Sequence, residues 1–386
     1  MQAATIDFDN PTFLIGRNGS GKSNIVDALS FLSDAMSLPL QSVFDKHGGI
    51  SAVRNRTSGK SFPPNLGLGV VFGSLNDNLK GGRYAFEIKA VPDHGFEVIR
   101  EQCIVFNVSG SSYWFDRTKN NAFQSNIKEL RPSLVSTSLG LPVIAGDVRF
   151  VSVLKTLSNI RTYSIDPRKL KEMQDPEGGV SLKSDGSNAA SVLQEISRTD
   201  DSEMQRICEI LETIVPNTTR VKPLKHGNKL SLEFTQEWGR DTKLNFESYC
   251  MSDGTLRALG ILTAVYQKPQ PSVLVVEEPE ATVHVGALEP ILDLLKTASK
   301  KMQIIVTTHS PEVLDMEWII DKMLRMVSWS EGATHISMIS EASRRTMAKH
   351  LVGAGELLRS NALDAESAPL FKEVENLEPD LFQELL

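Results

Sequence analysis

The feature that most constrains the fold of this 386-residue chain is Gly16–Ser23, which reads Gly-Arg-Asn-Gly-Ser-Gly-Lys-Ser. It fits the phosphate-binding pattern G-x-x-x-x-G-K-[ST] without a mismatch. A short apolar run, Thr12–Ile15, precedes it, and apolar residues recur at helical spacing through the following stretch, Lys22–Met36. Since the motif requires a strand, a glycine loop and a helix in this order, the segment predicts a nucleoside triphosphate site.

The residue types of the loop explain this chemistry. Glycines let backbone N–H groups wrap around phosphates, and the N-terminus of the following helix adds a favourable dipole. We expect Lys22 to reach the β- and γ-phosphates and the Ser23 hydroxyl to bind Mg²⁺. A glycine-rich turn with a chance Lys-Ser pair is the alternative, which the flanking pattern disfavours. The predicted nucleotide-binding residues here are Gly16, Arg17, Asn18, Gly19, Ser20, Gly21, Lys22, Ser23 and Asn24.

Composition limits the class of protein. Hydrophobic and charged fractions of 40% and 23% are ordinary for a globular chain. No apolar stretch is long enough to span a membrane and no signal peptide is visible, so we expect a cytoplasmic protein without a membrane partner. A net charge of −7 argues against binding nucleic acid over the whole surface, but leaves a local basic patch open. The three cysteines form no C-x-x-C pair, so no zinc ribbon or disulfide framework is indicated.

Two stretches with different sequence patterns follow the predicted helix after the phosphate loop. Residues 37–65 have turn chemistry, so we expect a solvated loop there. Four β-type runs between about residues 66 and 123 predict an antiparallel meander. Its Tyr113–Phe115 cluster could stack on a base, although aromatic residues on strands more often pack in the core. A basic edge that contacts phosphate stays open for the loop side chains Lys46, Arg54, Arg56 and Lys60.

The middle of the chain predicts a small helical insertion. We expect an extended piece near Arg149–Leu154, helices over Ala189–Ser197 and Met204–Val215, and a hairpin formed by Lys229–Thr235 and Thr242–Phe246. The C-terminal half then alternates helices with strands, which indicates a parallel sheet with crossovers.

A second candidate element of the site follows the apolar strand Ser272–Val276, which ends in Glu277-Glu278-Pro279-Glu280. Ligands of open α/β sheets bind at the carboxyl ends of the strands. We therefore expect Glu277 to hold the Mg²⁺ shell and Glu278 to act as the general base that accepts a proton from the attacking water. A merely solvated strand end is the weaker alternative.

Two further segments could contact the nucleotide. His309 follows the strand Gln303–Thr307, where it could hydrogen-bond the γ-phosphate. The run Ser252, Asp253, Gly254, Thr255 opens a helix, and such an N-terminus can bind an anion or serve only as a helix cap.

In this order, the four motifs resemble those of ABC-type ATPase heads of the RecF/SMC-like group. They are more closely similar to the stand-alone, OLD-related AAA-labelled ATPases of bacterial and phage-defence loci. The resemblance covers about residues 8–330, and His284 also resembles the family's residue in the loop after the acidic strand. It implies an α/β P-loop NTPase fold of the ABC-ATPase type, ATP and Mg²⁺ as cofactors, and ATP hydrolysis.

The resemblance also implies a shared site. Two copies of such heads bind head to tail, so Ser252–Thr255 of one copy would contact the γ-phosphate on Gly16–Ser23 of the other. ATP would close this dimer and hydrolysis would open it. The chain departs from the family in three ways: Glu277 replaces a frequent Asp, the strand and aromatic residue that often precede the loop are missing, and the Q-loop glutamine is not placed. The metal contact of Glu277 could thus run through water, and adenine recognition stays open.

The leading hypothesis is a motor or sensor ATPase subunit of a DNA-linked or anti-phage complex. Its effector, such as a nuclease or toxin, would be a separate protein, because residues 330–386 lack the acidic pattern of the OLD nuclease domain. The alternative is a nucleotide-gated DNA-binding module in DNA repair or chromosome maintenance, and a transporter subunit is disfavoured.

We divide the chain into a first ATPase lobe with a mixed or parallel central sheet and the meander (1–160), a helical insertion with a hairpin (161–250), a second ATPase lobe (251–340) and a C-terminal helical tail (341–386).

Overall fold

The computed structural model describes residues 4–54, 65–75, 78–93, 95–118, 122–144, 146–178, 181–239, 242–330, 333–349, 352–365 and 381–382. These residues form a central six-stranded sheet in the order β14-β13-β1-β12-β11-β7. All neighbouring strands in it are parallel except β14, which is antiparallel to β13. The mixed sheet expected for the P-loop fold is therefore confirmed. Its strands are β1 (Thr12–Ile15), β7 (Ile160–Tyr163), β11 (Val273–Glu277), β12 (Gln303–Thr308), β13 (Leu324–Ser330) and β14 (Ala333–Ser337).

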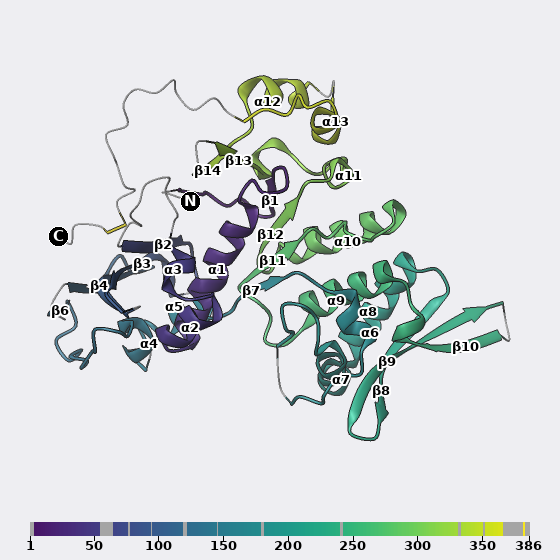
Figure 1. Ribbon diagram of the computed structural model, residues 1–386, viewed down its shortest axis with the longest axis horizontal. Helices are drawn as coiled ribbons and strands as arrows, with labels where there is room; N and C mark the ends of the chain where they lie inside the picture. Colours follow the sequence, from purple (N-terminus) through teal and green to yellow (C-terminus); the bar gives the residue numbers. More distant parts are fainter. Residues whose placement is uncertain are drawn as a thin grey trace.

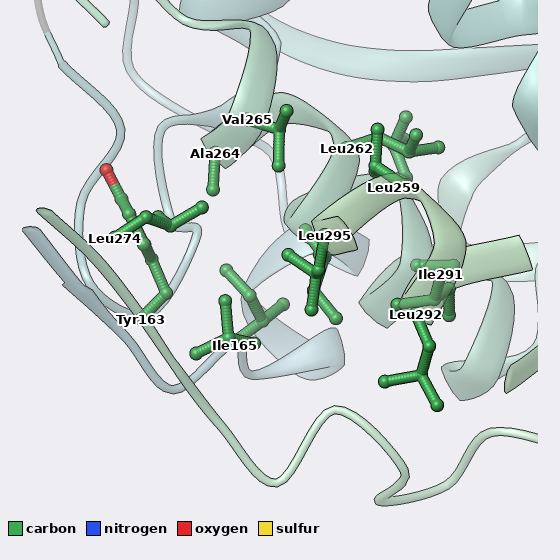
Figure 2. Close-up of a cluster of buried hydrophobic side chains, with 14 of the residues drawn as sticks. Tyr163, Ile165, Leu259, Leu262, Ala264, Val265, Leu274, Ile291, Leu292 and Leu295 are labelled. Carbon is green, nitrogen blue, oxygen red and sulfur yellow. The ribbon is translucent and has the colours of Figure 1, made fainter. Parts of the chain in front are cut away.

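Helices cover both faces of this sheet, which explains the uninterrupted apolar runs in β1 and β11. On one face Leu14 packs against Ile25 and Val26 of α1 (Lys22–Ser37). On the other face Phe13 and Ile15 belong to a core shared with α9 (Asp253–Tyr266) and α10 (Val285–Ala298). Figure 1 shows α1 on one side of the strands and α9 and α10 on the other. Figure 2 shows this second core, in which side chains of α9 and α10 meet those of β7 and β11.

A second sheet lies beside α1 and is antiparallel throughout (Figure 1). It confirms the predicted meander and adds a fifth strand at its edge. Phe115 of the aromatic cluster is buried and packs against Phe123 and Phe150, so its ring belongs to the core and is not open to a base. The strands, in spatial order, are β2 (Asn65–Phe72), β3 (Leu79–Val91), β4 (Gly95–Asn107), β5 (Ser112–Thr118) and β6 (Ala122–Ser125).

Two local expectations are wrong, and both concern helices that pack in the core of the antiparallel sheet. The segment expected as a solvated loop contains α2 (Leu40–Lys46) and α3 (Ile50–Val53). Their apolar residues are buried with those of the antiparallel sheet, a tertiary contact that the turn-rich sequence does not reveal. Lys46 forms an ion pair of 2.8 Å with Asp34, and Arg56 and Lys60 lie outside the described residues. The stretch expected as extended near Arg149 instead enters α5 (Val151–Leu157), which follows α4 (Gly140–Ile144).

The remaining described elements lie between β7 and α9 and after β12. Both predicted helices of the insertion are present, and its hairpin gains a third strand, β8. None of the helices in the described ranges is long and apolar enough to cross a bilayer. The elements are α6 (Pro167–Lys171), α7 (Ala189–Thr199), α8 (Asp201–Ile214), β8 (Thr218–His226), β9 (Lys229–Trp238), β10 (Thr242–Glu247), α11 (Pro311–Leu314), α12 (Glu341–Ala348) and α13 (Ala354–Arg359), with short 3-10 turns at Ser248–Cys250 and Asp321–Met323.

Candidate nucleotide site

The strand register brings three of the predicted motifs to one edge of the central sheet. Ile15, the last residue of β1, pairs with Thr308 of β12, and Glu277, the last residue of β11, pairs with Thr307. The phosphate loop, the acidic run and His309 therefore leave three adjacent strands at the same level. These strands lie side by side in Figure 1. This is the edge at which open α/β sheets bind their ligands.

The phosphate loop turns sharply into α1. Gly21 precedes the helix with φ of 102°, and a Cβ atom there would lie 2.2 Å from Oγ1 of Thr334. No side chain of the described residues caps α1, so the N–H groups of Lys22 and Ser23 stay available to an anion, while that of Asn24 donates to the carbonyl of Gly21 at 3.1 Å. Nζ of Lys22 donates hydrogen bonds to the carbonyl oxygens of Gly16, at 2.6 Å, and Arg17, at 3.2 Å. The lysine thus folds back across the concave side of its own loop.

The loop fits a phosphate group. Oγ of Ser20 is buried and has no hydrogen-bond partner among the described residues, although a buried hydroxyl normally has one. Burial also lowers the pKa of Lys22, an effect opposed by the negative charges of Glu278, Glu280 and Glu277. A phosphate oxygen would satisfy both groups. The other predicted loop residues, Arg17, Asn18, Gly19, Ser23 and Asn24, are exposed, and Arg17 donates to Oδ1 of Asn361 at 3.3 Å.

The carboxylates near the loop fit Mg²⁺ only together with a nucleotide. Within the described ranges, no group of three or more His, Cys, Asp or Glu side chains could hold a metal ion by itself. Mg²⁺ is usually bound through one or two carboxylates and the substrate phosphates, keeping several waters. An exposed Ser23 hydroxyl and the half-buried Glu277 carboxylate, together with phosphate oxygens, match that donor set.

Glu277 has an acidic neighbour that the sequence analysis missed. Burial raises the pKa of Glu277, and the charges of Asp27 and Glu278 raise it further, against the opposing charges of Arg257 and Lys22. Asp27 lies on α1 four residues after Ser23, so both face the same side of the helix. That spacing is visible in the sequence and could have identified Asp27 as part of the site.

Glu278 and His309 contact each other. Oε1 of Glu278 lies 3.2 Å from Nδ1 of His309, and the backbone N–H of Glu278 donates to the carbonyl of Thr307 at 3.0 Å. Glu278 has φ of 43°, a left-handed conformation that is uncommon for a residue other than glycine. Such conformations concentrate at functional sites. The arrangement joins the predicted base to the predicted phosphate contact.

Glu280 lies deeper than Glu278. Its Oε1 accepts a hydrogen bond of 2.7 Å from Oγ1 of Thr308 and lies 3.9 Å from Nδ1 of His309. Its Oε2 is buried without a hydrogen-bond partner among the described residues. Burial raises the pKa of Glu280. The third acid of the run therefore lies among the proposed site residues, although its position in the sequence predicts no role for it.

Arg257, on α9, lies beside the acidic cluster formed by Glu277, Glu278 and Glu280. Its guanidinium donates to the carbonyl of Ile165 at 2.9 Å and to the carbonyl of Glu277 at 3.3 Å. Burial lowers the pKa of Arg257, and the surrounding carboxylates, led by Glu280 and Glu278, oppose this effect. Nothing in the local sequence marks this arginine, because its partners come from β11 and from the segment after β7.

The predicted signature segment begins α9. Oγ of Ser252 accepts a hydrogen bond of 3.1 Å from the N–H of Thr255, which makes Ser252 the N-cap of the helix. Asp253 forms an ion pair of 2.6 Å with Lys171. A Cβ atom on Gly254 would lie 2.6 Å from the carbonyl oxygen of Thr282, so the segment abuts the loop after the acidic run.

The structure does not bring this segment to the phosphate loop of its own chain. Ser252 and Asp253 are exposed, and none of the hydrogen bonds or ion pairs of the described residues connects Ser252–Thr255 with Gly16–Ser23. His284 is also exposed, and its Nδ1 caps α10 by accepting from the N–H of Gly286 at 3.2 Å.

Comparison with known proteins gives one family and a set of solved structures. A family model described as "AAA domain, putative AbiEii toxin, Type IV TA system" matches residues 12–315. No curated protein matches the sequence.

The similar solved structures include heads of SMC proteins. An SmcHead bound to the C-winged helix domain of ScpA is 15% identical with a TM-score of 0.49, covering 88% of this chain and 94% of that one. A Pyrococcus furiosus Smc head with an extended coiled coil, bound to the C-terminal domain of ScpA, is 13% identical with a TM-score of 0.48, covering 90% and 94%. The SMC head domain from Thermotoga maritima is 17% identical with a TM-score of 0.38, covering 87% and 92%.

Proposed function

Since this chain belongs to the family described as AAA domain, putative AbiEii toxin, Type IV TA system, we propose that it is an ABC-type ATPase head of the RecF/SMC-like group that binds ATP with Mg²⁺ at Gly16–Ser23 and hydrolyses it. The observation that carries the proposal is the contact between Glu278 and His309 at the strand ends beside the phosphate loop. The contact supports the proposal because a carboxylate and an imidazole lie together beside the loop, on the side to which we assign the γ-phosphate.

The loop residues bind and orient the triphosphate. Nζ of Lys22 exchanges the carbonyls of Gly16 and Arg17 for phosphate oxygens, and the buried Ser20 hydroxyl donates to the same group. Ser23 and Glu277 hold Mg²⁺, which when bound neutralises charge that develops on the phosphates. Asp27 adds negative charge beside Glu277 and strengthens the attraction for the cation.

Glu278 and His309 act on the water and on the γ-phosphate. Oε1 of Glu278 takes a proton from the water that attacks the γ-phosphate, as a general base. Nε2–H of His309 donates a hydrogen bond to a γ-phosphate oxygen, and Nδ1 accepts a hydrogen bond from the Glu278 carboxyl group once that group has taken the proton. Arg257 keeps the end of β11 in place through its bond to the carbonyl of Glu277.

The site is shared between two copies of the chain. The exposed N-terminus of α9 offers a serine, a glycine and the positive end of the helix dipole to an anion. Because no contact among the described residues joins it to its own phosphate loop, we assign it to the γ-phosphate of a second copy, in a head-to-tail pair with two equivalent sites. ATP closes this pair, and hydrolysis lets it open.

The family description supports a role in defence. It refers to a toxin and a toxin–antitoxin system, which agrees with an ATPase subunit that works in the cytoplasm with a separate effector such as a nuclease or toxin. DNA is a further candidate partner, as the trigger that the ATPase senses. Co-purification of the full chain with its natural partners, with and without ATP, tests this assignment, and a chain that always purifies alone contradicts it.

Magnesium-dependent ATP turnover by the full chain tests the enzymatic proposal. We expect the wild type to release phosphate from ATP and Lys22→Ala to lose ATP binding and turnover together, because this lysine is the cation that spans the loop. Lys296→Ala is the matched control, since this lysine lies on α10 and contacts the ring of Trp318. Equal ATP affinity in wild type and Lys22→Ala would refute the proposed site.

A further inference from the structure

The strand next to the phosphate loop extends past it. Met326 of β13 pairs with Ile15, the last residue of β1, so residues 327–330 continue alongside the loop. A Cβ atom on Gly16 would lie 2.2 Å from the carbonyl oxygen of Val327, which shows how closely the two segments approach. The hairpin of β13 and β14 therefore forms one wall of the loop, as Figure 1 shows for its strands beside β1.

One side of this hairpin faces the start of α1. Val327 and its cross-strand partner Ile336 pack with Ile25 and Val26 of α1. Two residues further along, Trp329 pairs with Thr334, and strand periodicity puts this pair on the same face. The position of Thr334 agrees, because its side chain is buried against Gly21.

Trp329 is the exposed member of this pair. The residue is 62% exposed, although its partner Thr334 is only 3% exposed. Within the described part of the chain, Trp329 has no aromatic or cation–π contact, whereas Trp238 packs on Phe246 and Trp318 packs on Phe13. The indole ring is thus open, and its strand partner Thr334 lies against Gly21, the loop residue that precedes α1.

The acidic cluster gives the direction in which a nucleotide would lie. Glu278 and His309 follow β11 and β12, on one side of β1, so the γ-phosphate faces that side. The base is at the opposite end of a nucleoside triphosphate. It must therefore leave the loop on the other side of β1, where β13 and β14 lie.

We propose that Trp329 is the stacking platform for the base of the bound nucleotide, an inference that rests on the proposed ATP site. The indole ring lies flat against one face of the base, while Thr334 fills the space between the ring and Gly21. Stacking on an aromatic ring tolerates different bases, because every base has a π-face. The hairpin therefore contributes affinity for nucleotides without choosing strongly between adenine and guanine.

The test compares triphosphate ligands that carry a nucleobase with one that does not. Equilibrium affinities for ATP, GTP and inorganic tripolyphosphate, each with Mg²⁺, are measured on the full chain carrying Glu278→Gln to suppress turnover. Trp329→Ala should weaken ATP and GTP on the order of ten- to a hundred-fold and leave tripolyphosphate unchanged. Trp329→Phe, which keeps an aromatic ring, should retain most of the affinity. Trp238→Ala is the matched control, since this partly exposed tryptophan lies on β9.

Each contrary result has a distinct meaning. Unchanged ATP affinity in Trp329→Ala overturns the stacking proposal and leaves the ATP site intact. An equal loss for ATP and tripolyphosphate also overturns it, because Trp329 would then act on the shape of the loop. If neither ligand binds before Trp329 is changed, the proposed ATP site itself falls, and the stacking proposal with it.

Discussion

Nδ1 of His309 lies 3.2 Å from Oε1 of Glu278, and this contact joins the ends of two neighbouring parallel strands. The two residues are 31 positions apart in the sequence. Their meeting depends on the register that sets Glu277 opposite Thr307, so a slip of one residue would turn one side chain away. The pairing of the strands thereby fixes the geometry of the proposed chemistry before a nucleotide binds.

The first prediction concerns Glu278 as the proposed general base. Glu278→Gln should lower kcat for ATP about 10²- to 10⁴-fold, because the amide cannot accept the proton of the attacking water. ATP affinity should stay close to that of the wild type, since the proposed binding groups are on the loop. Phosphate release and equilibrium binding measure the two effects separately. Glu289→Gln, an exposed acid on α10, is the control. A rate unchanged in Glu278→Gln would show that another group activates the water.

The second prediction concerns the shared site. Ser252→Arg should keep nucleotide binding and abolish turnover, because the bulky cation blocks the segment offered to the partner's γ-phosphate. Mixing Ser252→Arg with Glu278→Gln before ATP is added should restore activity. Half of the randomly formed pairs are mixed and each has one intact site, so about a quarter of the wild-type rate is expected.

The helix cap at Ser252 needs its own control. Losing this cap costs about 1 kcal/mol of stability, which could lower activity for a reason unrelated to a partner. Ser252→Asn keeps a capping side chain and adds no large cation, so it should remain folded and partly active. If the mixture of Ser252→Arg and Glu278→Gln stays inactive while both variants are folded, the site is not shared in the proposed manner.

The third prediction concerns Arg257, which lies beside the acidic cluster. Arg257→Met keeps much of the side-chain volume but removes two hydrogen bonds, to the carbonyls of Ile165 and Glu277. We expect the free energy of unfolding to fall on the order of 2–3 kcal/mol, since these bonds come from a charged, buried donor. Chemical denaturation measures the change. Arg198→Met, on an exposed arginine of α7, should have little effect, and equal losses in both variants would contradict the supporting role of Arg257.

The fourth prediction concerns pH. Burial raises the pKa of Glu280, so its ionised form destabilises the folded state. This penalty is fully present above the raised pKa, and it disappears as the pH falls below the ordinary value for glutamate. Glu280→Gln should therefore raise Tm near neutral pH, with a difference that vanishes in acid. A neutral-pH Tm equal to or below that of the wild type would contradict this.

Asp147 provides a control of opposite sign for the pH experiment. The hydrogen bond from Arg149 holds the pKa of Asp147 below its usual range, so the ionised carboxylate stabilises the folded state. This stabilisation is present above the ordinary pKa and is lost as the pH falls through the lowered one. Asp147→Asn should lower Tm near neutral pH and have no effect in strong acid, the reverse of the trend at Glu280.

Much of the central sheet could be predicted because local sequence and tertiary environment agree there. The apolar runs before the phosphate loop and before Glu277 form strands at the expected positions. Prediction failed where a segment depends on a distant partner. The helices α2 and α5 exist because their apolar residues reach the core of the antiparallel sheet, and short helices are marginal without such packing.

The phosphate loop, the acidic run, His309 and the start of α9 were identifiable from the sequence alone, since each couples a few residue types to one adjoining element. Only the tertiary structure decided which of them meet. It joined Glu278 to His309, placed Asp27 and Arg257 around the acids, kept Ser252 away from its own loop, and set Thr334, the strand partner of Trp329, against Gly21. The physical reason is that motifs follow from short-range geometry, whereas these contacts depend on strand order and register, which link residues tens to hundreds of positions apart.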